Sequence, residues 1–180
     1  MLDAGAGWGD TALHFANKVG PGGHVISVEF TPTNLAIMRK NFELNPSLKP
    51  RIEIVENALW DKSGNTMSYS ENGPATRLAG KNAGATDTSV ASISVDDLVK
   101  TKSLTRIDFI KMDIEGAELA ALREPNILCG ALNPSWQFAS IIVWKISSTS
   151  LTTWLLCNWA IVSSCDTSRS ILTRPCCLRR

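Results

Sequence analysis

The first ten residues contain a glycine-rich run, DAGAGWGD at residues 3–10, whose residue types suit a small ligand. Glycines let the backbone approach a ligand closely, and a helix beginning after the run would offer unpaired N–H groups. Asp3 precedes the first glycine by two positions, and a carboxylate there would repel a pyrophosphate and favour a cationic ligand. Gly9 also stands one residue too early for the GxGxxG pattern of a dinucleotide site. The run therefore predicts a site for a cationic ligand, although such turns are also common as purely structural features.

Two further polar residues follow the next predicted strands. Glu29 ends a predicted strand at residues 24–29, and a carboxylate roughly 20 residues beyond a glycine-rich turn is placed to accept both ribose hydroxyls. Asn57 and Ala58 follow a predicted strand at residues 51–56, at a sheet edge that would border a base. A solvated glutamate at a strand end and a plain turn asparagine are the alternatives.

The segment IKMDIEGAEL, residues 110–119, places Asp113 at the carboxyl end of a predicted strand. Open α/β sheets bind ligands at these ends, so Asp113 is the candidate for acid–base chemistry. Glu115 and Glu118 follow on the predicted opening turn of a helix, where they could act in the site or only complement the helix dipole. The cysteines have no histidine partners at metal-ligand spacing, so we predict no metal site.

The elements that must position these residues alternate between strands and helices. This alternation predicts an α/β fold with a mostly parallel sheet and helices on both faces. The first predicted strand is short, so we expect the chain to begin inside it. The predicted elements are strands at 1–3, 24–29, 51–56, 67–69, 92–95 and 107–112, helices at 10–19, 31–44 and 116–122, and a surface loop at 73–88.

Composition narrows the function classes. The chain has 180 residues, a formal net charge of +1 and 44% hydrophobic residues, which is typical of one globular domain. So small a net charge argues against nucleic-acid binding. The absence of an apolar run of about 20 residues argues against a membrane span. The start carries no signal-peptide pattern, so we expect a cytoplasmic location.

Five segments occur in the order and spacing of one enzyme family. Together they resemble the FkbM family of methyltransferases, and IKMDIEGAEL is the most diagnostic part. The resemblance covers about residues 1–122. The segments are LDAGAGWGDTALHFA, HVISVEFTPTNLAIMRKNFELN, NALWDKSG, SISVDDL and IDFIKMDIEGAEL.

The resemblance implies a Rossmann-like class I methyltransferase fold, incomplete at both ends, and S-adenosylmethionine as cofactor. It also implies methyl transfer to a hydroxyl of a small-molecule or glycan acceptor, such as a sugar, a lipid-linked glycan or a natural product. An NAD-dependent oxidoreductase on a similar fold and a non-catalytic product of a broken gene are the alternatives. The residues carried over are Asp3, Gly5, Ala6 and Gly7 for the methionine part, Glu29 for the ribose, Asn57 and Ala58 for the adenine, and Asp113 as the base.

The composition changes abruptly after Leu122. Residues 1–122 contain 12 basic and 15 acidic residues, whereas residues 123–180 contain 6 and 2. All five cysteines and four of the six tryptophans lie in this second part, and we interpret the cysteines as free thiols. Codons compatible with the tail, read one base earlier, permit segments similar to the family's carboxyl terminus. We therefore predict a cofactor-binding core at 1–122 and an out-of-frame tail at 123–180, within which residues 138–144 are apolar enough to imitate a strand.

Overall fold

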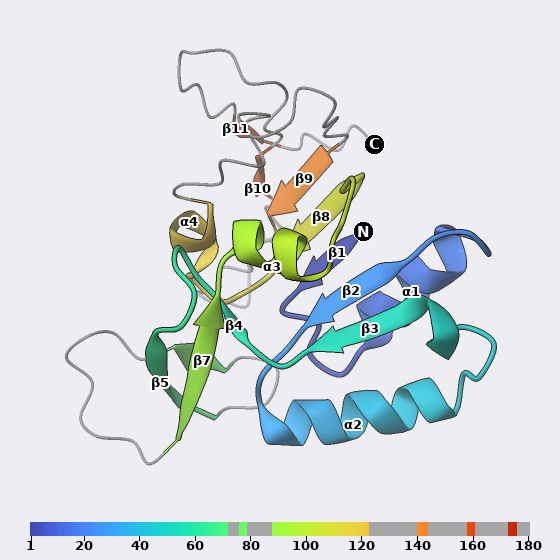
Figure 1. Ribbon diagram of the computed structural model, residues 1–180, viewed down its shortest axis with the longest axis horizontal. Helices are drawn as coiled ribbons and strands as arrows, with labels where there is room; N and C mark the ends of the chain where they lie inside the picture. Colours follow the sequence, from blue (N-terminus) through green and yellow to red (C-terminus); the bar gives the residue numbers. More distant parts are fainter. Residues whose placement is uncertain (72–75, 79–87, 123–139, 144–157, 161–172, 176–180) are drawn as a thin grey trace.

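The structure is a computed structural model that describes residues 1–71, 76–78, 88–122, 140–143, 158–160 and 173–175. Its centre is a five-stranded parallel sheet in the order β3-β2-β1-β8-β9 (Figure 1). The predicted α/β class with a mostly parallel sheet is confirmed. The strands are β1 (Leu2–Ala4), β2 (Val25–Val28), β3 (Ile52–Val55), β8 (Phe109–Met112) and β9 (Ser140–Val143).

A second, mixed sheet lies beyond the carboxyl ends of these strands, in the order β4-β7-β5-β6 (Figure 1). Its strands are β4 (Ala58–Leu59), β5 (Thr66–Ser70), β6 (Arg77–Leu78) and β7 (Ser89–Ile93). Two short antiparallel strands, β10 (Asn158–Ala160) and β11 (Thr173–Pro175), form a third sheet. Residues 73–88 were predicted to be a loop, and this is wrong for β6, which pairs with β5.

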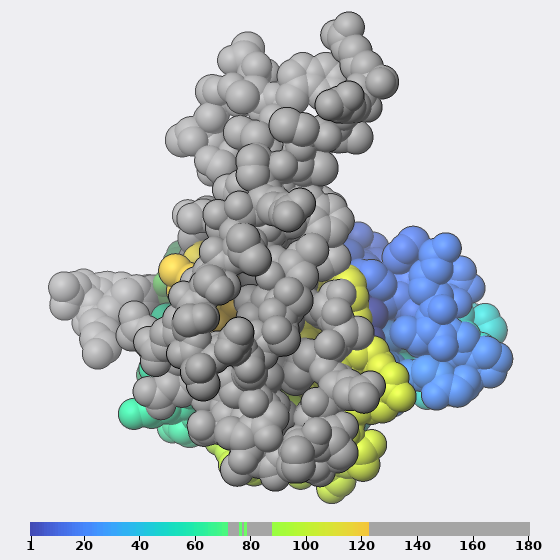
Figure 2. All heavy atoms as spheres, turned by 90° about the horizontal axis from the view of Figure 1, so that it is seen from above, coloured from blue at the N-terminus to red at the C-terminus, as the bar shows by residue number. Residues whose placement is uncertain are grey.

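Helices cover both faces of the central sheet. On one face, α1 (Asp10–Lys18) and α2 (Pro32–Glu43) pack on an apolar cluster that includes Val25. On the other face, α3 (Val95–Thr101) and the short α4 (Glu118–Ala121) pack on a cluster that includes Ile26 and Ile110. A 3-10 turn, η1 (Lys49–Arg51), leads into β3. Figure 2 shows the amino-terminal residues, in blue, gathered on one side of the molecule.

Side chains alternate across the three inner strands because successive residues of a strand point to opposite faces. Asp3 on β1 is in register with Ser27 on β2 and Lys111 on β8. Asp3 also accepts a hydrogen bond from Thr11 of α1, so this row of three polar residues faces α1. The residues that precede them in the three strands, Leu2, Ile26 and Ile110, point to the opposite face, towards α3.

Several predicted details need correction. Leu44 was expected on the apolar side of α2, but it follows the end of the helix and is 74% exposed. Thr31 stands at the predicted N-cap position, yet its side chain makes no cap bond and its hydroxyl donates to Glu29 instead. Helix α4 begins at Glu118, later than the predicted Gly116, because Glu115 and Gly116 have left-handed backbone conformations. Helix α3 was not predicted.

Candidate functional site

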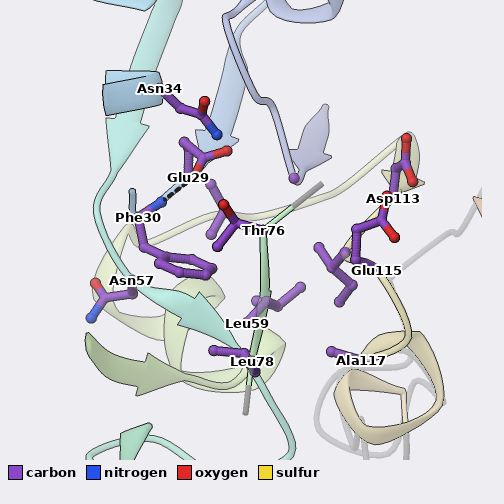
Figure 3. A pocket seen from close by; sticks show the side chains of 13 residues that line it. Glu29, Phe30, Asn34, Asn57, Leu59, Thr76, Leu78, Asp113, Glu115 and Ala117 are labelled. Atoms are coloured by element: carbon purple, nitrogen blue, oxygen red, sulfur yellow. Dashed lines mark hydrogen bonds between the residues drawn. The ribbon is translucent and has the colours of Figure 1, made fainter. Parts of the chain in front are cut away.

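The strand order reverses at β1, because β2 lies on one side of it and β8 on the other. In open α/β sheets a ligand-binding crevice forms outside the carboxyl ends of the strands at such a switch point. A pocket lies there, and four residues predicted for the site line it: Gly5, Glu29, Asn57 and Asp113. Asp113 and Glu115 lie across the pocket from Glu29 (Figure 3). Of the glycine-rich turn, Gly5 lines this pocket together with Glu29.

The glycine-rich turn is shaped by contacts that only glycine permits. Gly5 has a φ of +73°, and a Cβ added to it would lie 1.9 Å from the carbonyl oxygen of Asp113. Gly9 has a φ of +81°, and a Cβ there would meet the side chains of Phe42 and Met38 in α2. A side chain at Gly5 would push the turn off β8, and one at Gly9 would push it off α2.

The Glu29 carboxylate joins the glycine-rich turn to the start of α2. Its Oε2 accepts a hydrogen bond from the backbone N–H of Gly7 at 2.9 Å. Its Oε1 accepts from the backbone N–H groups of Phe30 at 2.8 Å and Thr31 at 2.9 Å, and from the Thr31 hydroxyl at 3.1 Å. A carboxylate has about four acceptor positions, so Oε2 is the oxygen with capacity left for a ligand hydroxyl.

Asp3 lies beneath the turn and is completely buried. Its Oδ2 accepts a hydrogen bond from the Thr11 hydroxyl at 2.7 Å, and its Oδ1 lies 3.1 Å from the Lys111 ammonium. The negative charge of Asp3 is thus compensated within the protein. Among the described residues Asp3 does not line the pocket, and the same holds for Ala6, Gly7 and Ala58. Ala6 and Ala58 directly follow the lining residues Gly5 and Asn57 in the chain, and Gly7 is linked to the site through its hydrogen bond to Glu29.

Asn57 and Ala58 lie where the central sheet continues into the second sheet. The Asn57 amide nitrogen donates to the carbonyl oxygen of Ala91 in β7 at 3.1 Å, which orients the side chain at the pocket wall. Ala58 belongs to β4, is buried, and pairs with Ser92 of β7. The second sheet therefore positions this corner of the pocket.

The segment after β8 brings two carboxylates, those of Asp113 and Glu115, to the opposite wall. The backbone N–H of Asp113 donates to the carbonyl of Ala4 at 3.0 Å, which holds the residue beside β1. Burial raises the pKa of the Asp113 carboxyl above its ordinary value, and although Lys111 opposes the rise, nearby carboxylates add to it. The Glu118 carboxylate accepts from the N–H groups of Ile114 at 3.1 Å and Gly116 at 3.2 Å, so it closes this turn.

Other lining residues were not predicted. Phe30 lines the pocket, and its ring makes an edge contact with Tyr69 at a centroid distance of 5.0 Å. Asn34 accepts a hydrogen bond from the Trp8 indole and ties α2 to the glycine-rich turn. Thr76 and Leu78 come from the region predicted to be a surface loop. Phe30 directly follows Glu29 and could have been found from that position, whereas nothing in the local pattern marks the other three.

Comparison with known proteins agrees with this architecture. Residues 3–147 match the family described as methyltransferase FkbM domain, and the match continues past Leu122 to include β9. The crystal structure of the methyltransferase FkbM from Methylobacillus flagellatus KT superposes with a TM-score of 0.51 at 19% sequence identity. The superposition covers 80% of this chain and 32% of that one, so the chain spans about a third of its length. No curated protein matches the sequence significantly.

Two kinds of feature are absent from the described part of the chain. It contains no helix long and apolar enough to cross a membrane. Within the same residues, no group of three or more histidine, cysteine, aspartate or glutamate side chains is arranged to hold a metal ion.

Proposed function

The chain belongs to the FkbM methyltransferase family, and from this membership we propose that it binds S-adenosylmethionine and directs its methyl group to a hydroxyl of a sugar, glycan or natural product. One observation carries the proposal. The glycine-rich turn, the Glu29 carboxylate and Asp113 share one pocket at the switch point of the parallel sheet. A cofactor and an acceptor need to meet at a single place of this kind.

The pocket residues suit the parts of this cofactor. Gly5 lines the pocket, so Gly5 and the adjoining Ala6 and Gly7 would hold the methionine part. Glu29 retains acceptor capacity at Oε2 and would bind the ribose hydroxyls. Asn57 and Ala58 would border the adenine. We assign Asp3 an indirect role, because it lies under the turn and is paired with Lys111.

When bound, S-adenosylmethionine would supply a methyl group already activated by its sulfonium. The protein would then mainly have to align the acceptor hydroxyl and remove its proton. We assign the proton to the Asp113 carboxylate. Burial raises the pKa of Asp113, and a general base works best when its pKa lies closer to the working pH.

Ligand binding would separate this proposal from the NAD-dependent alternative. Thermal unfolding would be followed with S-adenosylhomocysteine, with NAD and without ligand. A ligand that binds only the folded state stabilises it by about 2.7 kcal/mol at a concentration of 100 times Kd. We expect stabilisation by S-adenosylhomocysteine alone. Stabilisation by NAD alone would reject the methyltransferase proposal.

We also propose that residues 1–122 carry the cofactor site and that residues 123–180 are translated out of frame. The abrupt change in charge and in cysteine and tryptophan content after Leu122 supports this proposal. The test is the nucleotide sequence around codon 123, together with a protein whose frame is restored from that codon. We expect the restored protein to melt at a higher temperature and to bind S-adenosylhomocysteine more tightly. Equal melting and binding by the two proteins would show that the tail is a genuine part of the fold.

A further inference from the structure

We propose that Lys111 is a positioning residue that holds the glycine-rich turn in its binding conformation through the carbonyl oxygen of Gly5. Its consequence for the cofactor rests on the function proposed above. Lys111 stands in the middle of β8, is buried, and does not line the pocket among the described residues. It would act on a ligand only through the turn.

The Lys111 ammonium makes two different contacts, a hydrogen bond to Gly5 and an ion pair with Asp3. Its Nζ donates a hydrogen bond to the carbonyl oxygen of Gly5 at 2.8 Å. It also lies 3.1 Å from Asp3 Oδ1, but this oxygen accepts no hydrogen bond of suitable geometry from the described residues. The ammonium is therefore held to Asp3 by charge, whereas its directed bond goes to the turn.

This bond completes a set of restraints on consecutive peptide groups of the turn. The N–H groups of Gly5 and Ala6 both donate to the Val28 carbonyl, at 3.0 and 3.1 Å. The Gly7 N–H donates to Glu29, and the Gly5 carbonyl accepts from Lys111. Glycine has more accessible backbone conformations than any other residue, so a glycine-rich turn keeps one shape only while such bonds restrain it.

Stability alone does not explain a charged pair at this place. Replacing a buried ion pair with apolar residues of similar volume is often neutral or stabilising. Apolar residues fill the opposite face of the same strands, and they would fill this face as well. What they could not supply is a donor to the Gly5 carbonyl.

Two double variants of the full chain isolate this donor. Asp3→Asn/Lys111→Met and Asp3→Asn/Lys111→Gln both remove the two charges and have side chains of similar length at position 111, but only glutamine can donate to Gly5. The first measurement is amide hydrogen exchange of Ala6 and Gly7 in the ligand-free protein, with Tyr69 in the second sheet as the control. We expect about tenfold faster exchange at Ala6 and Gly7 in the methionine variant, as for the loss of one hydrogen bond, and equal exchange at Tyr69.

The second measurement is the affinity for S-adenosylhomocysteine by calorimetry, which we expect to be about tenfold weaker in the methionine variant. Equal exchange in the two variants would overturn the inference, whatever the affinities. The inference would also be overturned if the double variant with methionine were globally unfolded while the double variant with glutamine stayed folded, because Lys111 would then serve stability. If the parent chain binds no S-adenosylhomocysteine while exchange differs as expected, the cofactor proposal fails and the positioning of the turn stands.

Discussion

The two faces of the central sheet are built from the same strands, yet they differ sharply in chemistry. Towards α3, strands β1, β2 and β8 present only apolar side chains, each at most 2% exposed. These are Leu2, Ala4, Ile26, Val28, Ile110 and Met112. Towards α1, the same strands present Val25 and Phe109 near their amino ends, followed by a row of three buried polar residues, Asp3, Ser27 and Lys111.

This difference separates stability from the shaping of the site. Burying a large apolar side chain stabilises a fold by about 1.5–3 kcal/mol, so the α3 face supplies much of the driving force. The polar row contributes little net stability, since the desolvation of an ion pair offsets its attraction. It lies directly under the glycine-rich turn, however, and contacts that turn at Gly5. Substitutions on the two faces should therefore affect different measurements.

The largest effect is expected from Lys111→Met. It leaves the Asp3 carboxylate buried without a countercharge, and breaking a buried pair in this way costs about 3–5 kcal/mol of unfolding free energy. Urea unfolding would measure the loss. The double variant Asp3→Asn/Lys111→Met should recover most of it, and a double variant as unstable as the single one would show that charge pairing is not what the polar row contributes.

Substitutions on the apolar face should lower the unfolding free energy without changing the affinity for the ligand. Ile110→Ala creates a cavity opposite Lys111 and should lower the unfolding free energy by about 2–5 kcal/mol. Ile110→Val is the matched control, with an expected loss of about 0.5–1.5 kcal/mol. The affinity of the folded fraction for S-adenosylhomocysteine should not change. A loss of affinity that follows cavity size would mean that both faces shape the site.

Glu29→Ala should reduce ligand affinity. Hydrogen bonds to a charged group contribute roughly 1.5–3 kcal/mol, and the substitution also releases Gly7 from the carboxylate. Calorimetry with S-adenosylhomocysteine would measure this effect. Glu53→Ala, on β3 and away from the pocket, is the matched control and should bind as the parent does. Unchanged affinity in Glu29→Ala would reject the ribose-binding role.

The smallest effect on stability is expected from Asp113→Asn, and its sign is a gain. Burial raises the pKa of the Asp113 carboxyl, so the folded state binds its proton more tightly than the unfolded state does. The resulting destabilisation is absent below the ordinary carboxylate pKa and complete above the raised one. At about pH 7 the variant should be slightly more stable than the parent, and at about pH 3 the difference should vanish.

Urea unfolding at the two pH values checks this sign, and a methyl-transfer assay with a hydroxyl acceptor checks the function. The asparagine variant should lose activity while it still binds S-adenosylhomocysteine. Activity equal to that of the parent would mean that Asp113 is not the base.

Much of the fold could be predicted because its signals are local. The apolar runs and breaks around residues 24–29, 51–56 and 107–112 predicted β2, β3 and β8 within a few residues. The resemblance to the FkbM family is confirmed by the match over residues 3–147. Helix α3 was missed although a local signal exists, because Ser94 caps it by accepting a hydrogen bond from the N–H of Asp97.

The amino-acid sequence alone was enough to place Gly5, Glu29, Asn57 and Asp113 at the ends of strands, because the end of a strand is marked by residues that interrupt its apolar pattern. It could not show that Asp3 pairs with Lys111 or that Lys111 reaches the Gly5 carbonyl, 106 positions earlier in the chain. That contact exists because β8 lies beside β1 in register, with Asp3 and Lys111 on the same face. Strand order is settled by the packing of whole helices and sheets, and no local pattern encodes it.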